Sequence, residues 1–574
     1  MLRCVIFEDD HLLAVNKPAG MNTHAPSPYA GEGLYEWLRN REPRWATLAI
    51  IHRLDKETSG VILFAKTALA NRSLTEQFTS RAVRKQYVFL TDRVAKDKEF
   101  NTKSALVRAG EKYLSRPLHA GGETAETRFR ILDQVPPVGD TRASISSQEI
   151  SSSRPSHARC LNAWIAEPIT GRTHQIRVHA ADQGLAILGD ILYAGTAAAR
   201  VYLHAAELRL KHPATGEELR FQAQPNFQDD PRLRIREQLI EADLTNSFRA
   251  VHGSSDGWPG WYVERLGDFA LSQSETPSDA RQQTQLGQIT DHFGLRGAYH
   301  KVLRRELCGT SPTDAAPRLI MGEPGPRSFV IRENGLEFEL SFTEGYSTGL
   351  FLDQRDNRRR LITGYVAPGF SISSLSPRPL PTKPLNTRGK IDNPSQKQDS
   401  RPTLLNAFAY TCAFSVCAAK SGFRTTSLDL SKKYLEWGKR NFALNHIPIE
   451  DHEFICGDVF DWLHRFRKKE RTFDIILLDP PTFSRSKSSG IFRVEKDYRK
   501  LLKLAVPLVK SGGVLFASTN AADWPAEKFI EHMKAEIRAA ARSITQLSFV
   551  PQPPDFPISR AEPAYLKTVW MRLS

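Results

Sequence analysis

Three apolar segments near the end of the chain each run into an aspartate, and this pattern constrains the fold more than any other feature. The aspartates are Asp429, Asp458 and Asp479, and an apolar run at residues 404–407 precedes them. This order predicts a Rossmann-like sheet, in which the first turn approaches a ligand and the acid after the second strand binds ribose hydroxyls. A nicotinamide cofactor would satisfy the same spacing, so the spacing alone leaves the ligand open.

The chain is too long to fold around one core. With 574 residues, of which 40% are hydrophobic, it should hold about three or four domains that each bury a core. The net charge of +15 and a pI near 9.5 indicate a polyanionic partner, with nucleic acid as the first expectation. We find no leader-like start and no long apolar run, so we expect a cytoplasmic protein with no membrane partner.

The cysteines argue against a disulfide framework. There are 6 of them, scattered along the chain without the C-x-x-C spacing of a thiolate zinc site. We therefore expect reduced thiols and no metal site, and the sequence leaves the oligomeric state open.

Changes in composition divide the chain into segments, and the expected fold class is multidomain α/β and α+β. The first domain is expected over residues 1–225, with a Ser- and Pro-rich insertion at 136–157. A small β-rich domain is expected over 226–365 and a flexible, Pro-rich insertion over 366–402. The acid-terminated strands then define the last domain, residues 403–574.

The most informative stretch of the first domain is residues 52–66. Arg53 stands two places before Asp55, and a Thr-Ser-Gly turn leads into the apolar run 61–65, which predicts a loop presenting both side chains ahead of a buried strand. A lone aspartate near a turn is more often a turn or cap residue. The full string, HRLDKETSG, resembles the signature of the RluA-type pseudouridine synthases. This resemblance implies that Asp55 is the nucleophile or base that detaches uracil from ribose.

Three more segments support this resemblance. They are NKPAG at residues 16–20, KQYV at 85–88 and PITGRTHQIRVH at 168–179. The resemblance implies a mixed-sheet synthase domain in which Tyr87, on a strand, stacks on the flipped base.

Arg177 is expected to pair with Asp55. Ile176 and Val178 flank it, and on a strand this alternation would turn Arg177 to the face opposite the apolar pair. By resemblance, the Asp55–Arg177 salt bridge keeps the carboxylate ionised and aimed at the ribose, and Arg53 inserts into the gap left by the base. The uridine must leave its stack to react, and no external cofactor is needed for this half.

The middle of the chain resembles a second enzyme family. Residues 248–263 read as a hairpin with a Gly/Pro turn, and residues 344–358 read EGYSTGLFLDQRDNR. Both resemble bacterial large-subunit rRNA methyltransferases of the cytosine-5 and guanine-N7 type, which implies an RNA-guiding β-rich domain. By this resemblance Phe351, Gln354 and Arg355 flank the methyl donor.

The last domain resembles the class I methyltransferases that use S-adenosyl-L-methionine. The resemblance implies that Asp458 lies near the adenine amine and that Asp479, Pro480, Pro481 and Phe483 form the loop that binds the target base. The other expected cofactor-binding residues come from the first two strand ends: Asn406, Phe408, Tyr410, Thr411 and Asp429. Relatives have glycine where this chain has Cys412, which puts the tightness of the cofactor turn in question.

The methylated atom can be argued from an absence. Carbon-5 of cytosine needs a thiolate to add at C6, but neither the 479–483 loop nor residues 518–520 contain cysteine. Guanine N7 already carries a lone pair, which favours it as the acceptor. An exocyclic amine stays open, and residues 554–557 resemble the cytosine-5 branch, so the branch stays open too.

The sequence therefore predicts a bifunctional RNA-modifying enzyme, an isomerase fused to a methyltransferase. Its expected partner is RNA, with 23S rRNA or a ribosome assembly intermediate favoured. Alternatives are a tRNA substrate for the synthase half, and a non-catalytic RNA-binding assembly factor.

Overall fold

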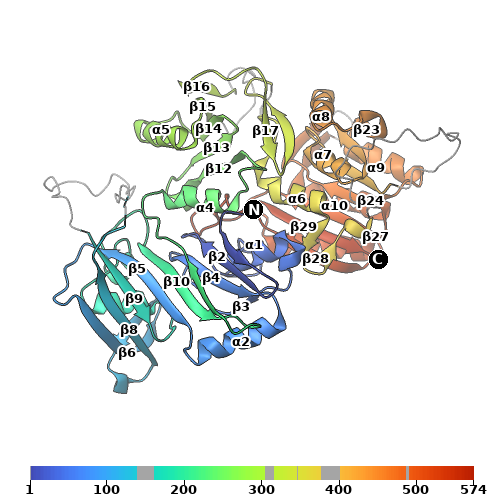
Figure 1. The fold of residues 1–574 in the computed structure, drawn as a ribbon. Helices are drawn as coiled ribbons and strands as arrows, with labels where there is room; N and C mark the ends of the chain where they lie inside the picture. The colour runs from blue at the N-terminus through green and yellow to red at the C-terminus, as the bar shows by residue number, and fades with distance from the viewer. Residues whose placement is uncertain are drawn as a thin grey trace, which may run out of the picture. The chain divides into compact units, whose positions relative to one another are not determined.

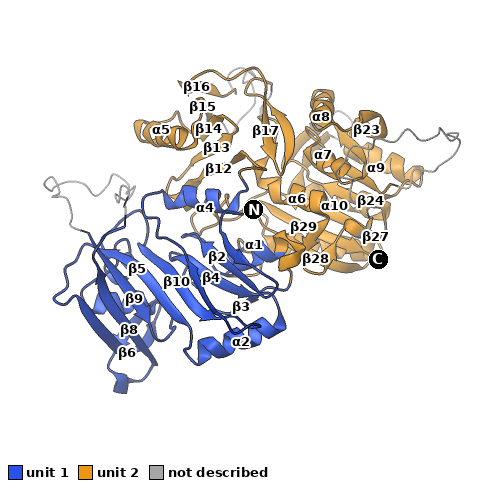
Figure 2. Cartoon of the chain, viewed as in Figure 1, with its two compact units in different colours: residues 1–26, 32–39, 47–241 blue, residues 27–31, 40–46, 242–574 orange. Residues whose placement is uncertain are grey.

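The computed structural model describes residues 2–136, 138, 161–303, 316–344, 347–375, 401–486 and 490–574. It divides into two compact units (Figure 2): unit 1 comprises residues 1–26, 32–39 and 47–241, and unit 2 comprises residues 27–31, 40–46 and 242–574. The insertion expected at 136–157 lies outside the described residues, apart from Pro136 and Val138. Within the described part of the chain, no helix is long and apolar enough to cross a membrane.

Unit 1 is built on one sheet of 11 strands (Figure 1). The strands are β1 (Val5–Glu8), β2 (Leu12–Lys17), β3 (Ala49–Ile50), β4 (Ser59–Ala65), β5 (Arg84–Thr91), β6 (Glu99–Ala109), β7 (Lys112–Arg116), β8 (Glu123–Leu132), β9 (Asn162–Pro168), β10 (Leu203–Lys211) and β11 (Glu218–Gln222). Their order is β1-β2-β4-β10-β5-β9-β8-β6-β7, with β3 beside β4 and β11 beside β10. Strands β4 and β10 run parallel and the other neighbours antiparallel, so the sheet is mixed, as predicted.

Helices in this part of the chain are short. They are α1 (Leu34–Arg41), α2 (Ala68–Thr79), α3 (Gln175–Asp182) and α4 (Pro231–Leu239), with 3-10 turns η1 (Pro43–Trp45), η2 (Leu118–Ala120) and η3 (Ile191–Tyr193). Helix α2 matches the amphipathic helix expected after the apolar strand, and the Thr67 hydroxyl caps it by accepting a hydrogen bond from Ala70 N at 3.2 Å. Helix α4 belongs to unit 1, so this unit extends beyond the boundary expected at residue 225.

Strand β4 carries the chain straight from the Asp55 loop into the core. All seven of its residues are buried, and the expected Thr-Ser-Gly turn contributes Ser59 and Gly60 to the strand itself. Gly60 has φ +116°, and a Cβ there would lie 2.2 Å from the carbonyl oxygen of Ala205 on β10. Glycine is therefore required where β4 and β10 meet.

The strand expected around Arg177 is wrong, because residues 175–182 form helix α3. Ile176, Arg177 and Val178 are all buried. An alternation over three residues cannot separate the two periodicities when the whole segment is buried.

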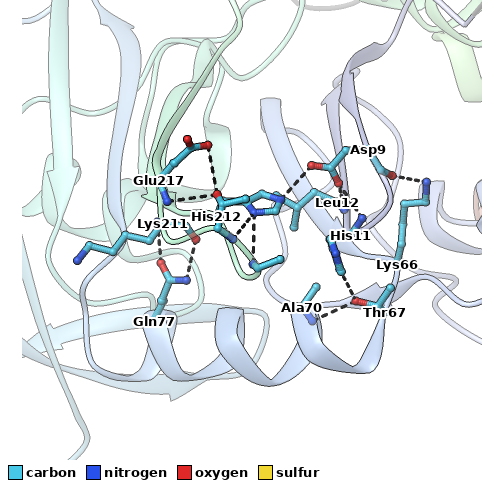
Figure 3. Close-up of polar contacts among 12 residues, drawn as sticks. Asp9, His11, Leu12, Lys66, Thr67, Ala70, Gln77, Lys211, His212 and Glu217 are labelled. Atoms are coloured by element: carbon cyan, nitrogen blue, oxygen red, sulfur yellow. Dashed lines mark hydrogen bonds and ion pairs between the residues drawn. The ribbon is translucent and has the colours of Figure 1, made fainter.

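Polar contacts connect two turns and the start of helix α2 at one end of the sheet (Figure 3). Asp9 Oδ1 accepts hydrogen bonds from the backbone N–H groups of His11 and Leu12, each at 2.7 Å, and its Oδ2 lies 3.0 Å from His212 Nε2. His11 Nδ1 in turn lies 3.0 Å from Thr67 Oγ1 at the start of α2. The cluster fixes the β1–β2 turn against the start of α2 and the β10–β11 turn.

Unit 2 begins with a sheet of five strands in sequence order. They are β12 (Ser247–His252), β13 (Trp261–Leu266), β14 (Phe269–Ser274), β15 (Gly297–Val302) and β16 (Arg318–Gly322). The antiparallel β12–β13 pair is the hairpin expected at 248–263. The segment also includes η4 (Gly253–Asp256), α5 (Ala280–Phe293) and the hairpin of β17 (Phe329–Glu333) with β18 (Leu336–Leu340). A small β-rich region is thus present, as predicted.

The Rossmann-like prediction is confirmed by a seven-stranded sheet of order β23-β22-β21-β24-β27-β29-β28. Its strands are β21 (Thr403–Ala407), β22 (Arg424–Asp429), β23 (Glu453–Cys456), β24 (Phe473–Leu478), β27 (Val509–Thr519), β28 (Ile544–Val550) and β29 (Lys567–Leu573). The first five strands of this order are parallel and β29 is antiparallel to its neighbours. The strand order reverses between β21 and β24, a point where such sheets bind ligands.

Helices cover both faces of this sheet. They are α6 (Arg355–Thr363), α7 (Ala413–Lys420), α8 (Lys432–Leu444), α9 (Val459–Lys468), α10 (Val494–Ala505) and α11 (Ala526–Ala539), with η5 (Leu352–Gln354), η6 (Ser373–Leu375), η7 (Ile449–Asp451) and η8 (Val506–Leu508). Leu404 packs in one core cluster with Leu361 of α6 and Leu435 of α8, and the next residue, Leu405, packs in another with Leu501 of α10. Side chains of β21 thus alternate between two buried faces, which explains its continuous apolar run.

The expectation that residues 366–402 cannot form a packed element is wrong at its start. Residues 365–371 form the hairpin of β19 (Tyr365–Ala367) and β20 (Phe370–Ser371). Val366, Phe370 and Ile372 are all buried, because they pack in the same core cluster as α6. Residues 376–400 lie outside the described residues.

Candidate active sites

A pocket of about 510 Å³ opens in unit 1. Its lining comes from the loop before β4, from the end of α2 and the start of β5, and from the loop that leads into α3. The four residues predicted for the uridine chemistry all line it: Arg53, Asp55, Tyr87 and Arg177. They come from segments that are far apart in sequence, so the fold brings them to one cavity.

The loop that carries Asp55 is fixed on both sides. Thr23 Oγ1 donates to the carbonyl oxygen of Leu54 at 2.8 Å and accepts from its N–H at 3.1 Å. His52 Nε2 accepts from the N–H of Leu63 on β4 at 3.1 Å, and burial lowers the pKa of His52 to about 3. His52 is therefore a neutral structural residue, and the Asp55 loop has little freedom to move.

Lys17, the lysine of NKPAG, fastens the neighbouring turn to the same loop. It is fully buried, and its ammonium donates to the carbonyl oxygens of Pro18 at 2.9 Å, Met21 at 2.7 Å and Lys56 at 3.2 Å. Burial lowers the pKa of Lys17 to about 7, and the nearby Glu57 and Asp55 carboxylates oppose this. The NKPAG turn is therefore held against the Asp55 loop, because carbonyl oxygens of both segments share one cation.

Arg177 faces three carboxylates, and the most distant is that of Glu57, whose Oε2 lies 3.9 Å from Arg177 Nη1. Arg177 Nε and Nη2 donate to the two oxygens of the buried Asp190 at 2.7 and 2.8 Å, and its Nη1 lies 3.6 Å from Asp55 Oδ2. The guanidinium also lies over the Tyr193 ring, 5.2 Å from its centroid. Asp190 thus forms a bidentate pair with the guanidinium, and Nη1 remains facing Asp55.

Tyr87 and Arg53 differ in burial. Tyr87 is half-buried on β5, and burial raises the pKa of its phenol, with Asp55 adding to the effect. The phenol therefore stays protonated and can donate a hydrogen bond. Arg53 is exposed, and its Nη2 donates to Thr173 Oγ1 at 3.1 Å.

Two supporting residues were missed by sequence reasoning. Asp190 carries no local signal, because its pairing with Arg177 is made only in the folded chain. Gln175 uses its whole amide: Oε1 accepts from Thr170 Oγ1 at 2.7 Å and Arg172 N at 3.0 Å, while Nε2 donates to Glu126 O and Thr127 Oγ1, each at 2.9 Å. A buried glutamine with four partners fixes the loop before α3.

The second site lies at the carboxyl ends of the parallel strands in unit 2. Strands β22 and β23 pair Asp429 with Cys456, and β21 pairs Ala407 with Leu428 and with Leu478 of β24, so these strand ends are level. Asp429 Oδ2 accepts from the N–H of Tyr410 and Oδ1 from that of Ser431, both at 2.8 Å. Burial raises the pKa of Asp429, and these two N–H donors oppose the rise.

The turn after β21 has an unusual backbone. Phe408, Tyr410 and Cys412 have φ values of 65°, 49° and 61°, in the left-handed region that favours glycine. The Cys412 side chain fits because helix α8 has Gly438 opposite it, where a Cβ would lie 2.4 Å from Cys412 Sγ. The departure from glycine at 412 is thus matched by a glycine on the helix that packs against it.

Gln354 and Asp479 meet at the end of β24. Gln354 Nε2 lies 3.2 Å from Asp479 Oδ1 and 2.9 Å from Ser518 Oγ on β27. Burial raises the pKa of Asp479 to about 6, and the Ser518 hydroxyl opposes this rise. Gln354 is buried, so its position is set by the core.

Two predicted residues beside Gln354 have different surroundings. Phe351 is 50% exposed, with its ring 5.3 Å from that of Tyr410. Arg355 is buried, and its Nη1 donates to Asp555 Oδ2 at 2.8 Å. Asp555 also accepts from the N–H of Arg249 at 3.0 Å, so it joins α6 to the five-stranded sheet. The predicted contact of Arg355 with the methyl donor stays a prediction.

Other predicted residues have structural contacts of their own. Asp458 caps α9, accepting from Phe460 N at 2.9 Å and Asp461 N at 3.3 Å. The remaining placements are as follows: Asn406 Nδ2 donates to Ser415 Oγ at 2.9 Å, Thr411 Oγ1 donates to Gly349 O at 2.6 Å, and the Phe408 and Phe492 rings lie 5.9 Å apart. In the loop predicted to bind the target base, Pro480 is buried, Pro481 is exposed and Phe483 is 56% exposed. Phe483 begins β25 (Phe483–Ser486), which pairs with β26 (Gly490–Arg493).

Comparisons with known proteins match one family to each half of the chain. A family described as RNA pseudouridylate synthase matches residues 11–182, and one described as S-adenosylmethionine-dependent methyltransferase matches residues 390–572. The ribosomal RNA large subunit methyltransferase of Deinococcus radiodurans is 31% identical over 338 residues, covering 57% of this chain and 73% of the relative. YwbD of Bacillus subtilis is 30% identical over 344 residues, covering 59% and 78%.

The chain belongs to the ribosomal RNA large subunit methyltransferase family. Its methyltransferase domain follows a pseudouridine synthase domain. The ribosomal large subunit pseudouridine synthase C of Yersinia pestis is 36% identical over 233 residues, which cover 38% of this chain and 65% of that relative. Both resemblances drawn from the sequence are confirmed.

The methyltransferase domain depends on S-adenosyl-L-methionine, and the residues present fit this cofactor. Asp429, Asp458 and Asp479 lie at or just beyond the ends of three strands of one sheet, where carboxylates suit ribose hydroxyls and an adenine amine. The half-exposed Phe351 ring beside Tyr410 adds an aromatic surface at the same turn.

Proposed function

We propose that this chain modifies large-subunit ribosomal RNA twice, by converting a uridine to pseudouridine and by methylating a base. The observation that carries the proposal is that Asp55, Tyr87 and Arg177 line the same pocket. The Deinococcus radiodurans and Yersinia pestis relatives are a large-subunit rRNA methyltransferase and a large-subunit pseudouridine synthase, which supports this substrate for both halves. The net charge of +15 suits a polyanion.

In the synthase half, the uridine leaves its stack and enters the pocket. Asp55 attacks the ribose or abstracts a proton, and the bond between uracil N1 and ribose C1′ breaks. The uracil rotates and its C5 bonds to C1′, any Asp55–ribose bond breaks, the hydrogen on C5 leaves as a proton and N1 takes up a proton. Arg177 orients Asp55, and the protonated Tyr87 stacks on the base and can share a hydrogen with it. Arg53, exposed at the rim, fills the gap in the RNA stack.

In the methyltransferase half, bound S-adenosyl-L-methionine supplies the methyl group. Asp429 holds the ribose hydroxyls and Asp458 lies near the adenine amine. The half-exposed Phe483 stacks on the target base, and Asp479 accepts a hydrogen from its edge. The other proposed cofactor-binding residues are Phe351, Gln354, Arg355, Asn406, Phe408, Tyr410 and Thr411.

Guanine N7 is the favoured methyl acceptor, because it needs positioning but no covalent activation. Carbon-5 of cytosine would need a thiolate, and burial raises the pKa of the Cys412 thiol to about 12. An exocyclic amine is the second candidate, because the Asp479 carboxylate can accept one of its hydrogens.

Mass mapping of 23S rRNA and tRNA from a deletion strain tests the proposal. The strain should lack one pseudouridine and one methyl group in 23S rRNA, and the full chain should restore both. Complementation with Asp55→Ala should restore only the methyl group, and Asp479→Ala only the pseudouridine. Loss of a tRNA pseudouridine with intact 23S rRNA would contradict the proposed substrate of the synthase half.

A further inference from the structure

A histidine that the uridine chemistry does not use faces Asp55 inside the synthase pocket. His174 lines the pocket, and its Nε2 lies 3.9 Å from Asp55 Oδ2, the oxygen that also faces Arg177 Nη1 at 3.6 Å. The His174 side chain is only 18% exposed. Two nitrogens thus converge on one carboxylate oxygen.

The hydrogen-bond partners on the far side of the ring decide which nitrogen carries the hydrogen. The backbone N–H of Tyr113 donates to the hydroxyl oxygen of Tyr193 at 2.9 Å. That hydroxyl lies 2.8 Å from His174 Nδ1. Among the contacts of the described residues, Nδ1 is the acceptor that the hydroxyl hydrogen can reach, so we infer that Tyr193 donates to it. Nδ1 is then an acceptor, and the ring hydrogen is on Nε2, toward Asp55.

The backbone holds this ring in place. His174 has φ 56° and ψ 12°, a left-handed conformation that costs a non-glycine residue free energy and persists only where the surroundings fix it. The next residue, Gln175, supplies that constraint through its four hydrogen bonds. The rings of Tyr113 and Tyr193 both meet His174 edge-on, each with centroids 5.6 Å away.

We propose that His174 is a positioning residue for Asp55, held by Tyr193 as the neutral Nε2–H tautomer so that it donates to the carboxylate beside Arg177. This inference rests on the proposed isomerase function. The separation of 3.9 Å exceeds a hydrogen bond and shortens when the uridine enters, as contacts in ligand-free active sites often do. With two donors on one oxygen, the other oxygen of Asp55 is turned toward the ribose.

The electrostatics around the ring support the neutral form. Burial lowers the pKa of His174, with Asp55, Asp190 and Glu57 opposing the shift and Arg177 adding to it. The rings of Tyr113 and Tyr193, two further titratable groups, also contact the His174 ring. His174 should therefore be uncharged at neutral pH and charged only in acid, below the ordinary range of histidine.

The first test reads the tautomer directly and needs no RNA. In full-length protein with ¹⁵N-labelled histidine, the signal lost in His174→Asn should carry the shifts of an Nε2–H imidazole at pH 7. Tyr193→Phe should remove the preference, whereas Tyr113→Phe, which keeps both the ring and the backbone N–H, should not. An Nδ1–H or doubly protonated ring in the unmodified protein would overturn the inference.

The second test measures single-turnover pseudouridine formation. His174→Asn, which suits the left-handed backbone but lacks a donor at the Nε2 position, should slow it about tenfold. His174→Gln places an amide nitrogen near that position and should recover most of the rate, although glutamine suits this backbone less well. Equal rates for His174→Asn and the unmodified chain would refute the role.

The pH profile gives a readout that a purely structural role would not change. The acid limb of the unmodified enzyme should move to higher pH in Tyr193→Phe, because the hydroxyl that favours the neutral ring is gone, and should stay in place in Tyr113→Phe. An unmoved limb in Tyr193→Phe would count against the inference. If the unmodified chain forms no pseudouridine on any RNA, the proposed function fails, and the tautomer measurement still decides the position of the hydrogen.

Discussion

The two candidate active sites place an aspartate beside partners of different kinds, a cation in one and a neutral amide in the other. Asp55 in the synthase pocket faces the guanidinium of Arg177 at 3.6 Å. Asp479 in the methyltransferase domain faces the neutral amide of Gln354 at 3.2 Å, and burial raises its pKa to about 6. A guanidinium beside a carboxylate pairs with its charge and fixes its orientation, which suits attack on a sugar. A neutral donor leaves the carboxylate close to taking up a proton, which suits a group that accepts a hydrogen from a base.

The largest expected effect is the loss of one activity with the other intact. Asp55→Asn keeps the size of the side chain and removes its charge, so pseudouridine formation should fall by about 10³-fold or more. Methylation of the same RNA should be unchanged, because Asp55 belongs to a different unit from the methyltransferase site. Quantitative mass spectrometry of one RNA sample measures both products.

The reciprocal variant is the control for this contrast. Asp479→Asn should lower methylation and leave pseudouridine formation unchanged. A variant that lowers both activities together would contradict the independence of the two sites.

Arg177 in the synthase pocket is held by a second carboxylate, that of Asp190, and removing this carboxylate should lower the stability of the synthase unit. Asp190→Asn leaves the buried Arg177 without its bidentate partner, and breaking a buried pair in this way costs about 3–5 kcal/mol. Denaturant unfolding of the full chain should show the synthase transition at lower denaturant. Asp182→Asn, on the same helix as Arg177 but exposed, is the matched control, and equal losses in the two variants would refute the special role of Asp190.

The contrast also separates what sequence could and could not predict. The acid-terminated strands of unit 2 follow from local apolar runs, so β21, β22 and β24 were predicted from pattern alone. The residues that tune each acid were harder to find. Arg177 lies on helix α3, where the sequence suggested a strand, and it pairs with Asp190 from the segment that follows the helix. Such a pairing exists only in the tertiary fold.

Glycines illustrate the same limit. The sequence raised a doubt at Cys412 because glycine was expected there, but it could not indicate that Gly438, on another helix, would make room for the sulfur. A local pattern reports the residue that departs from a motif, whereas the residue that compensates for it is found through packing.

The backbone supports of the two sites differ as well. Hydrogen bonds fix the Asp55 loop, whereas the turn that meets Asp429 combines hydrogen bonds with a close steric fit between Cys412 and Gly438. Gly438→Ala should destabilise the methyltransferase domain by about 1–3 kcal/mol, because the new methyl group would meet Cys412 Sγ at 2.4 Å. Cys412→Gly should suppress most of this loss in the double variant, as thermal unfolding would show. Equal losses in the single and double variants would mean that the sulfur is not the obstacle.

The smallest predicted effect concerns the pH dependence of methylation. The pKa of Asp479, raised by burial to about 6, means that the carboxylate accepts hydrogen bonds above that pH and is protonated below it. Methylation should therefore fall about tenfold per pH unit below pH 6, under conditions where methyl transfer limits the rate. Ser518→Ala should move this limb to higher pH, because the Ser518 hydroxyl holds the pKa down, while Asp353 and Arg358 act on the same group with opposite signs. An acid limb that does not move in Ser518→Ala would assign the titration to another group. The contrast between Asp55, paired with a cation, and Asp479, paired with neutral donors, would then have no functional consequence.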